Sequence, residues 1–387
     1  LPSIYGHKYN DVNANGVYDA GDLPLSGWNI YIDANGNGSF DSGELSTTTN
    51  ANGEYSFLGL PSGLNTVCEE IQTGWTQSYP KDNNGCHKVT LGALGQSNAV
   101  VEDIDFLNYE TPTLTVIKKV VNDHGGSATV DDFEIKIGND LITFGEGEVN
   151  GSTTTYTSTP SVLANVSYLL TEKNDATGYT AGSWNCVDND TGNTVSNPVV
   201  LVAGQNVTCT ITNDDKPGSI KIIKDVNPDN SSKWNFTVTT PIPGVTYEIS
   251  DIGDNEYHTL LNLVSGSYTI TETSDSNYVT SISCNDGTIA NGTSINVDLS
   301  LGEELVCTFT NTQKGSISGY KLNDLDNDYE TTEDRFGVAG WTIELLKDEE
   351  VIASKVTDSS GYFSFSNLEP ATYQLREAIV SGWIKLY

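Results

Sequence analysis

The sequence contains no methionine and few cationic residues. Its 18 Lys and Arg stand against 52 Asp and Glu, which gives a formal net charge of −34. A surface of that sign repels nucleic acid and anionic membranes and attracts divalent cations. No apolar run approaches the ~20 residues that a membrane-spanning helix needs, and we expect no signal peptide within this sequence. Because even residue 1 is not methionine, we expect a processed mature chain or a segment of a longer one.

Patterns typical of enzyme sites are also missing. His7, His87, His124 and His258 are scattered, without metal-ligand spacing, and no nucleophile elbow or phosphate-binding glycine loop is present. The many acidic turns could in principle supply a pair of glycosidase carboxylates, but such turns on β-sandwiches are usually solvated or bind calcium. We therefore expect no enzymatic activity.

A repeat near the two ends shows that the chain is modular. Residues 4–28 (IYGHKYNDVNANGVYDAGDLPLSGW) return at 317–341 (ISGYKLNDLDNDYETTEDRFGVAGW), and each copy runs from a strand through an Asp/Asn-rich loop into an alternating strand. The first loop has the spacing of a twelve-residue calcium loop with a glycine in its sixth place. The predicted ligands are Asp11, Asn13, Asn15, Val17, Asp19 and Asp22.

A second loop with this spacing follows almost at once. Its predicted ligands are Asp33, Asn35, Asn37, Ser39, Asp41 and Glu44. A hard cation takes six to eight oxygens at ~2.3–2.6 Å, which a tight loop supplies by turning alternate side chains inward. The alternative is a solvated hairpin turn, which Asp, Asn and Gly also favour. No amphipathic helix flanks either loop, so we expect calcium clasps between strands, with a structural rather than a switching role.

The far copy keeps only part of this pattern. Its predicted ligands are Asp324, Asp326 and Asp328. Tyr329 stands where the glycine belongs and Arg335 where the last acid belongs, so Glu333 or Asp334 would have to substitute.

The six cysteines form three local pairs, which are Cys68 with Cys86, Cys186 with Cys209, and Cys284 with Cys307. The last two pairs share a separation of 23 residues. Equal spacing in repeated modules predicts one disulfide within each module, and therefore an oxidising, extracellular or cell-surface location.

The two ends resemble a known family. The segments SGYKLND, AGWTIEL, TDSSGYFSFSNLEPATYQLRE and SGW resemble the B modules of the staphylococcal serine-aspartate repeat adhesins. That resemblance implies calcium-binding β-sandwiches of a surface stalk at 1–110 (module one) and 315–387 (module four). Module four stops at Tyr387, apparently before its last strands.

The middle of the chain resembles a second family. The segments VIKKVVND, SYLLTEKNDATGY and NVTCTITNDD parallel IIKDVNPD, SYTITETSDSNY and LVCTFTNTQ, and both sets are similar to the transthyretin-like, collagen-adhesin B-type domains of bacterial surface proteins and pilins. This predicts module two at 111–214 and module three at 215–314. We expect an all-β chain of tandem immunoglobulin-like or transthyretin-like sandwiches, joined by short linkers into a stiff rod.

Each module places a lysine in its first strand. Strand alternation puts the lysines of modules two and three on the apolar face, and a Glu and an Asn from later strands point inward as well. The trios are Lys118, Glu172 and Asn213 in module two, and Lys224, Glu272 and Asn311 in module three. Module one has the matching Lys8, Glu69 and Asn108, and module four keeps Lys321 and Glu377.

In the domains that modules two and three resemble, such a trio forms an isopeptide bond, in which a neutral Lys attacks the Asn amide while a protonated Glu assists. Apolar burial favours both protonation states. The calcium modules that module one resembles are not known for this bond. The alternative in every module is a buried salt bridge with an Asn hydrogen bond.

Two functions fit these patterns. The first is a structural subunit of a calcium-stabilised extracellular filament or cell-surface stalk, which joins other copies of itself head to tail. The second is a surface adhesin whose β-modules bind a host or neighbouring-cell ligand. Repetition of small β-modules favours the structural role.

Overall fold

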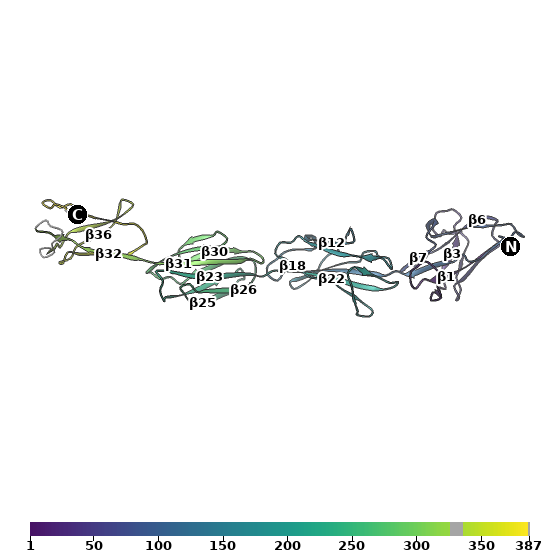
Figure 1. The fold of residues 1–387 in the computed structure, drawn as a ribbon. Coiled ribbons are helices and arrows are strands. Elements are labelled where there is room, and N and C mark those ends of the chain that lie inside the picture. Colours follow the sequence, from purple (N-terminus) through teal and green to yellow (C-terminus); the bar gives the residue numbers. More distant parts are fainter. Residues whose placement is uncertain (326–335, 386–387) are drawn as a thin grey trace. The chain divides into compact units, whose positions relative to one another are not determined.

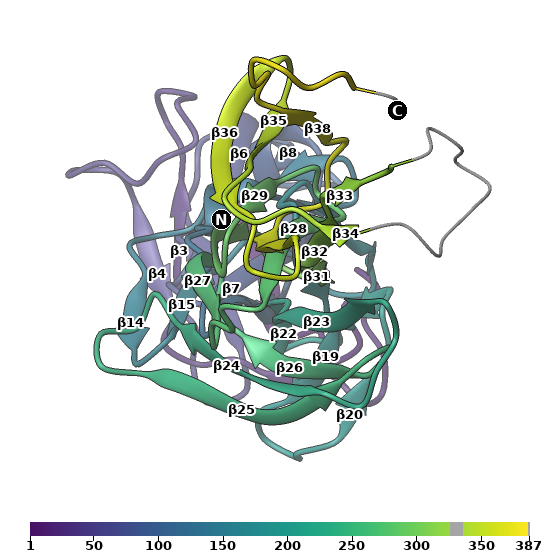
Figure 2. The same cartoon turned by 90° about the vertical axis from the view of Figure 1, so that its left-hand side faces the viewer.

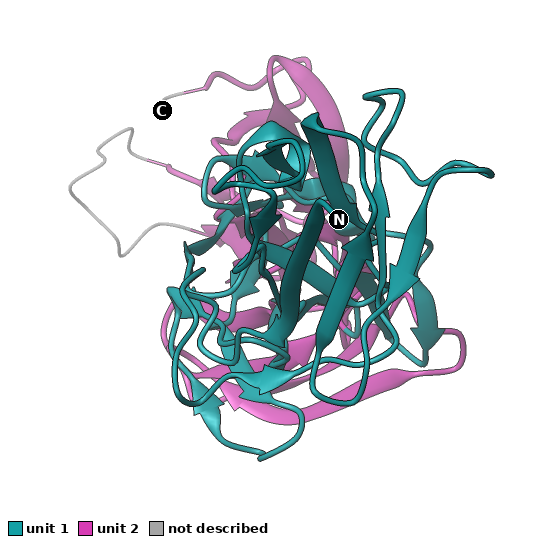
Figure 3. Cartoon of the chain, turned by 90° about the vertical axis from the view of Figure 1, so that its right-hand side faces the viewer, with its two compact units in different colours: residues 1–123, 127–214 teal, residues 124–126, 215–387 magenta. Residues whose placement is uncertain are grey.

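The computed structural model describes residues 1–325 and 336–385. These residues form strands, loops and two short 3₁₀ turns, η1 (Asn83–Gly85) and η2 (Val130–Asp132), without any α-helix. Figure 1 labels the strands along the chain. The chain groups into two compact units, residues 1–123 with 127–214 and residues 124–126 with 215–387 (Figure 3). The prediction of an all-β chain is confirmed, whereas the rod and the four module boundaries stay predictions.

Module one is a two-sheet sandwich organised around its first strand. In one sheet β1 (Ser3–Asn10) pairs with β2 (Leu23–Pro24), β5 (Glu54–Leu58), β9 (Val100–Val101) and β10 (Phe106–Glu110), and β10 pairs with β7 (Trp75–Tyr79). The other sheet has the order β4 (Ser46–Thr48), β3 (Asn29–Ile32), β6 (Gly63–Glu69), β8 (His87–Leu91). Ile4, Ile30, Phe57, Val67 and Phe106 pack in the core between the sheets.

Module two repeats this plan around β11. The large sheet contains β11 (Thr113–Val121), β14 (Glu148–Asn150), β15 (Thr153–Ser158), β18 (Tyr179–Ala181), β19 (Asn185–Asp188), β20 (Thr194–Val195) and β22 (Asn206–Asp215). Smaller sheets are formed by β12 (Phe133–Ile137), β13 (Asp140–Leu141) and β17 (Leu170–Asn174), and by β16 (Ser167–Tyr168) with β21 (Val199–Val200).

The segment SYLLTEK (167–173) of module two is divided between two sheets at Leu169. The Asn197 side chain explains the division. Its Oδ1 accepts the Leu170 N–H at 2.9 Å and its Nδ2 donates to the Leu170 carbonyl at 2.8 Å, so it replaces a strand neighbour.

Modules one and two belong to the same compact unit because hydrogen bonds link the segments on either side of their junction. The Gly204 N–H donates to the Glu110 carbonyl at 2.7 Å, and Asn165 Nδ2 donates to the Asn13 carbonyl at 2.7 Å.

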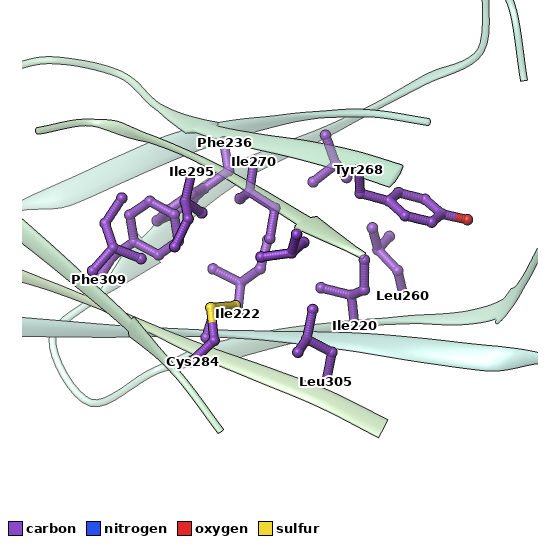
Figure 4. Close-up of a cluster of buried hydrophobic side chains, with 14 of the residues drawn as sticks. Ile220, Ile222, Phe236, Leu260, Tyr268, Ile270, Cys284, Ile295, Leu305 and Phe309 are labelled. Carbon is purple, nitrogen blue, oxygen red and sulfur yellow. A yellow bond between two sulfur atoms is a disulfide. The ribbon is translucent and has the colours of Figure 1, made fainter. Parts of the chain in front are cut away.

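Module three has the most extensive core. One sheet has the order β26 (Tyr257–Leu263), β23 (Gly218–Asn227), β31 (Glu304–Gln313), β28 (Tyr278–Cys284), β29 (Ile289–Asn291). The facing sheet has the order β25 (Thr246–Gly253), β24 (Lys233–Thr239), β27 (Gly266–Glu272), β30 (Ser294–Leu299). Figure 4 shows Ile222 from the first sheet and Phe236 and Ile270 from the second within this cluster.

Module four is the smallest. Its strand β32 (Gly315–Tyr320) pairs with β37 (Tyr362–Leu368), and β33 (Leu322–Asn323) pairs with β34 (Phe336–Gly337). Strand β35 (Thr342–Lys347) lies between β36 (Glu350–Val356) and β38 (Gln374–Glu377), side by side in Figure 2. Among the described residues, β32 has no parallel partner strand, unlike the first strands of the other modules.

The first and last strands of modules one to three are parallel neighbours. Strand β1 pairs with β10, β11 with β22, and β23 with β31. The three predicted cysteine pairs are disulfides in the structure. Cys186 faces Cys209, and Cys284 faces Cys307, on directly paired residues of neighbouring antiparallel strands. Each of these two disulfides therefore fastens the last strand to its other neighbour.

Candidate functional site: buried lysine trios and acidic loops

The first strand of each of modules one to three buries a lysine completely. In β11, alternation brings Leu114, Val116, Lys118 and Val120 to the core face, and β23 does the same with Lys224. Lys8, Lys118 and Lys224 are each 0% exposed. An isolated ammonium is far too costly to bury alone, so the surroundings must either pair it or neutralise it.

The glutamate comes from the facing sheet, at the same register in every module. Glu69 pairs with Ile30, Glu172 with Ile135, Glu272 with Phe236, and Glu377 with Ile343. Strand pairing therefore fixes the carboxylate opposite the lysine, across the core.

The asparagine comes from the last strand, also at a constant register. Lys8 pairs with Phe106, Lys118 with Ile211, and Lys224 with Phe309, and the asparagine lies two residues further along in each case. Asn108, Asn213 and Asn311 therefore share the core face with the lysine. They are at most 1% exposed.

A fourth member was missed by the sequence analysis. An aromatic ring lies over the Nζ atom of the first-strand lysine in each of the four modules. The distance from Nζ to the ring centroid is 4.5 Å for Trp28, 3.9 Å for Phe133, 4.7 Å for Trp234 and 4.8 Å for Trp341. In every module the aromatic residue lies two positions before the residue that pairs with the glutamate in the sheet. This constant spacing is the signal that could have revealed the ring. The ring face attracts a cation and also excludes water from the amine.

Contacts within the trio differ between modules. In module two Lys118 Nζ donates to Glu172 Oε1 and, at 2.5 Å, to Asn213 Oδ1. In module three Lys224 Nζ lies 3.2 Å from Glu272 Oε1 and donates to the Phe309 carbonyl at 2.7 Å. Module two thus holds the amine directly against the amide that it would attack.

In module one Lys8 Nζ lies 3.0 Å from Glu69 Oε2, and both side chains are 0% exposed. The approach is within ion-pair distance but lacks hydrogen-bond geometry, and the two polar atoms of the buried Asn108 amide form no hydrogen bond of good geometry either. Unsatisfied buried polar atoms are costly, so a reaction that removes them is favoured.

Burial shifts the protonation equilibria of these groups toward the neutral forms. It lowers the pKa of Lys8 to about 8, against the attraction of Glu69, and raises the pKa of Glu69 to about 7, against the attraction of Lys8. Burial also lowers the pKa of Lys118 and of Lys224 and raises the pKa of Glu272. A neutral amine beside a protonated carboxyl is the combination that amide exchange requires.

Module four has only the pair. Lys321 Nζ lies 2.7 Å from Glu377 Oε2, and the two side chains are 18% and 16% exposed. The lysine and glutamate positions are thus the same as in the other modules, but with more access to solvent.

The first acidic loop closes on its own side chains. Asp11 is 0% exposed and accepts the N–H groups of Asn15 and Gly16 at 3.1 and 2.8 Å. Asn13 and Asn15 donate to Asp19 Oδ2 at 2.8 and 2.6 Å. Asp22, the last predicted ligand of this loop, accepts the N–H groups of Val12 and Asp19.

The second loop repeats most of these contacts, although its first aspartate accepts the N–H of the fourth residue of the loop instead of the fifth. Asp33 accepts the N–H groups of Gly36 and Gly38, and Asn35 and Asn37 both donate to Asp41 Oδ2 at 2.7 Å. Glu44 accepts the N–H groups of Ala34 and Asp41. The Val17 and Ser39 N–H groups donate to Asn15 and Asn37 in the same way.

These loops fit a divalent cation by their donor chemistry. Each offers three carboxylates and two amide oxygens at the predicted spacing. Among the described residues, no Lys, Arg or His forms an ion pair with a carboxylate of either loop. In the third acidic loop Asp326 and Asp328, with Tyr329, Glu333, Asp334 and Arg335, lie outside the described residues.

Three family matches cover most of the chain. The family described as SdrD B-like domain matches residues 3–101 and 315–385. Two families described as prealbumin-like fold domains match residues 110–211 and 220–313. The matches follow the division between the modules with acidic loops and the modules without them.

Two curated relatives align with almost the whole chain. Serine-aspartate repeat-containing protein F of Staphylococcus epidermidis is 26% identical over 420 residues, covering 96% of the chain and 24% of the relative. Serine-aspartate repeat-containing protein D of Staphylococcus aureus is 26% identical over 432 residues, covering 96% of the chain and 30% of the relative. The chain thus spans less than a third of the length of these relatives.

Two solved structures align with the chain at low TM-scores. The Bacillus anthracis TIE protein aligns with a TM-score of 0.35 and 15% identity, covering 81% of this chain and 51% of that one. The major pilin of Streptococcus pyogenes aligns with a TM-score of 0.27 and 17% identity, covering 52% of this chain and 98% of the pilin.

Tandem β-modules with buried trios and disulfides define a modular surface protein. The chain is homologous to the serine-aspartate repeat proteins and consists of SdrD B-like and prealbumin-like domains. The predicted extracellular, cell-surface location is confirmed by these relatives. In the described part of the chain, no helix is both long and apolar enough to cross a membrane.

The contribution of the aromatic ring can be measured by comparing two substitutions in module three. Trp234→Leu removes a buried ring that lies over Lys224 Nζ, and we expect the module to lose about 2–4 kcal/mol of stability, chiefly from lost packing. Tyr257→Leu is the matched control, since Lys221 lies 4.0 Å from that ring but Tyr257 is 62% exposed. Denaturant unfolding of both variants checks this, and equal losses would contradict a special role for the buried ring.

Proposed function

We propose that this chain is a load-bearing segment of a cell-surface stalk or filament, with its modules stabilised by calcium and by internal covalent bonds. The homology supports a stalk-like or adhesin-like role at the cell surface. The observation that supports a load-bearing role is the position of the Lys, Glu and Asn trio within each module. Lysine and asparagine lie on the first and last strands of a module, which are direct neighbours.

That position matters for tension. A pull along the chain enters a module at its first strand and leaves at its last. A bond between those two strands carries the load directly, so the remaining strands are not peeled from the sandwich. Module two shows the arrangement clearly, because Asn213 lies on β22 and Lys118 on the adjacent β11, with 2.5 Å between the amine and the amide oxygen.

We infer isopeptide bonds between Lys118 and Asn213 and between Lys224 and Asn311. The neutral Lys Nζ attacks the Asn Cγ, a new C–N bond forms, and the Cγ–Nδ2 bond breaks with release of ammonia. Glu172 or Glu272 transfers the proton from the amine to the leaving nitrogen. The reaction occurs once per module, and we propose that the chain has no enzymatic turnover.

Calcium is the second stabilising element in this proposal. Asp11, Asp19 and Asp22 would hold one ion and Asp33, Asp41 and Glu44 another, assisted by the asparagines between them. The bound ion would neutralise carboxylates that otherwise repel one another within each loop.

The proposal also includes assembly of the chain with other copies of itself, head to tail. On β32, the edge that the last strand occupies in the other modules has no strand partner among the described residues. An open strand edge can accept a strand from another copy, and contacts of this head-to-tail kind extend into filaments.

Chelation should loosen module one, and module four with it, while modules two and three stay folded. At a calcium concentration 100-fold above Kd, one site contributes about 2.7 kcal/mol. Calorimetry with and without a chelator measures this on the full chain. Asp33→Asn with Glu44→Gln should reproduce part of the loss, whereas Asp286→Asn in an exposed turn of module three should have no effect. An unchanged melting profile would rule out the calcium assignment.

Each isopeptide bond should lower the intact mass of the reduced chain by ~17 Da, the mass of ammonia. Glu172→Ala and Glu272→Ala should each restore that mass for their own module. Glu248→Ala is the control, because this exposed carboxylate only accepts a hydrogen bond from Thr237. If the Lys118 and Lys224 peptides of the wild-type protein are recovered unlinked, the buried salt bridge is the correct alternative.

Self-assembly predicts that the purified chain forms oligomers whose mass rises with concentration. Size-exclusion chromatography with light scattering, in calcium, measures that mass. A monomer at every concentration would contradict head-to-tail assembly by this chain but would leave the stabilisation of its modules untouched.

A further inference from the structure

We propose that module one, an SdrD B-like domain, also closes itself covalently, through an isopeptide bond between Lys8 Nζ and Asn108 Cγ, with Glu69 as the proton-transfer group. The function proposed above places such bonds only in the two prealbumin-like modules. Module one lies within the SdrD B-like match, outside the two prealbumin-like matches.

The strand register that positions the trio of module one is the same as in modules two and three. Asn108 is aligned with Asn10 in the parallel pair of β1 and β10, two residues beyond the partner of Lys8. Asn213 and Asn311 occupy the same offset from Lys118 and Lys224. Glu69 is likewise paired with Ile30 as Glu272 is with Phe236.

Burial is at least as complete in module one as in the other two. The side chains of Lys8 and Glu69 are both 0% exposed, and Asn108 is 0% exposed as a residue. Trp28 covers the amine at 4.5 Å. Water therefore has no access to compete with the amine for the amide carbon.

The unreacted trio is poorly satisfied by hydrogen bonds. Lys8 Nζ, both Glu69 oxygens and both polar atoms of the Asn108 amide have none of acceptable geometry. Burial also brings the pKa of Lys8 down to about 8 and that of Glu69 up to about 7, so near neutral pH the uncharged pair is readily reached. Bond formation releases the Asn108 amide nitrogen as ammonia and turns the ionisable amine of Lys8 into a neutral amide N–H, so the core loses one unsatisfied polar atom and its buried cation.

The reaction is balanced without any further reagent. The lone pair of the neutral Lys8 amine forms the new bond to Asn108 Cγ, and the Cγ–Nδ2 bond breaks. Glu69 accepts the proton from the attacking nitrogen and returns one to the departing nitrogen, so it ends protonated as it began. Amine and amide become a secondary amide and ammonia.

The product is a covalent ring that runs from residue 8 to residue 108. It encloses both complete acidic loops and the Cys68–Cys86 disulfide. Module one would therefore keep its first and last strands joined even when cations are withdrawn and the disulfide is reduced.

Peptide mapping of the reduced, alkylated full chain tests the proposal. We expect the segments that contain Lys8 and Asn108 to appear as one branched species, ~17 Da lighter than their sum. Lys8→Arg and Glu69→Gln should abolish that species. Lys88→Arg, at an exposed lysine of the same module, should retain it.

Recovery of Lys8 and Asn108 in separate, unmodified peptides of the wild-type protein would overturn the proposal, even if a variant fails to fold. The same digest independently detects the linked peptides that contain Lys118 with Asn213 and Lys224 with Asn311. Failure of the bond in module one is therefore distinguishable from failure of the bonds in modules two and three.

Discussion

The fold depends on how each module tolerates a lysine at the centre of its core. Placing an ammonium in an apolar interior is unfavourable by several kcal/mol unless it is paired or neutralised. The four modules meet that requirement with a glutamate from the facing sheet and an aromatic ring over the amine, and three of them add an asparagine from the last strand. The register of the strands around the core is therefore fixed by polar groups as well as by packing, since a shift by one residue would leave the charge unpaired.

Most of this arrangement could be predicted from the sequence. Alternation along VIKKVV and IKIIKDV placed Lys118 and Lys224 on the buried face, and alignment of the modules placed the Glu and Asn partners beside them. The acidic loops were also predictable, because their spacing determines which side chain can reach which backbone N–H. The cysteine pairs were predictable from their equal spacing in repeated modules.

Other features depend on contacts that no local pattern reveals. The ring over each lysine comes from a different sheet, so Phe133 and Trp234 become visible as equivalents only once the strands are paired. The break at Leu169 depends on Asn197, a side chain 27 residues away that satisfies a backbone group. The hydrogen bonds of Lys118 and Lys224 differ although their trios match, because side-chain rotamers are set by the packing of each core.

Parallel pairing of the first and last strands has a geometric consequence for length. In module two the chain enters where Thr113 lies beside Asn206 and leaves where Val121 lies beside Asp214, so entry and exit are at opposite ends of one nine-residue pair. At ~3.3 Å per residue, that pair advances the chain by about 30 Å. An antiparallel pairing would have returned the chain to its starting end. In the predicted rod, each added module of this kind would therefore lengthen the chain by a step of about this size.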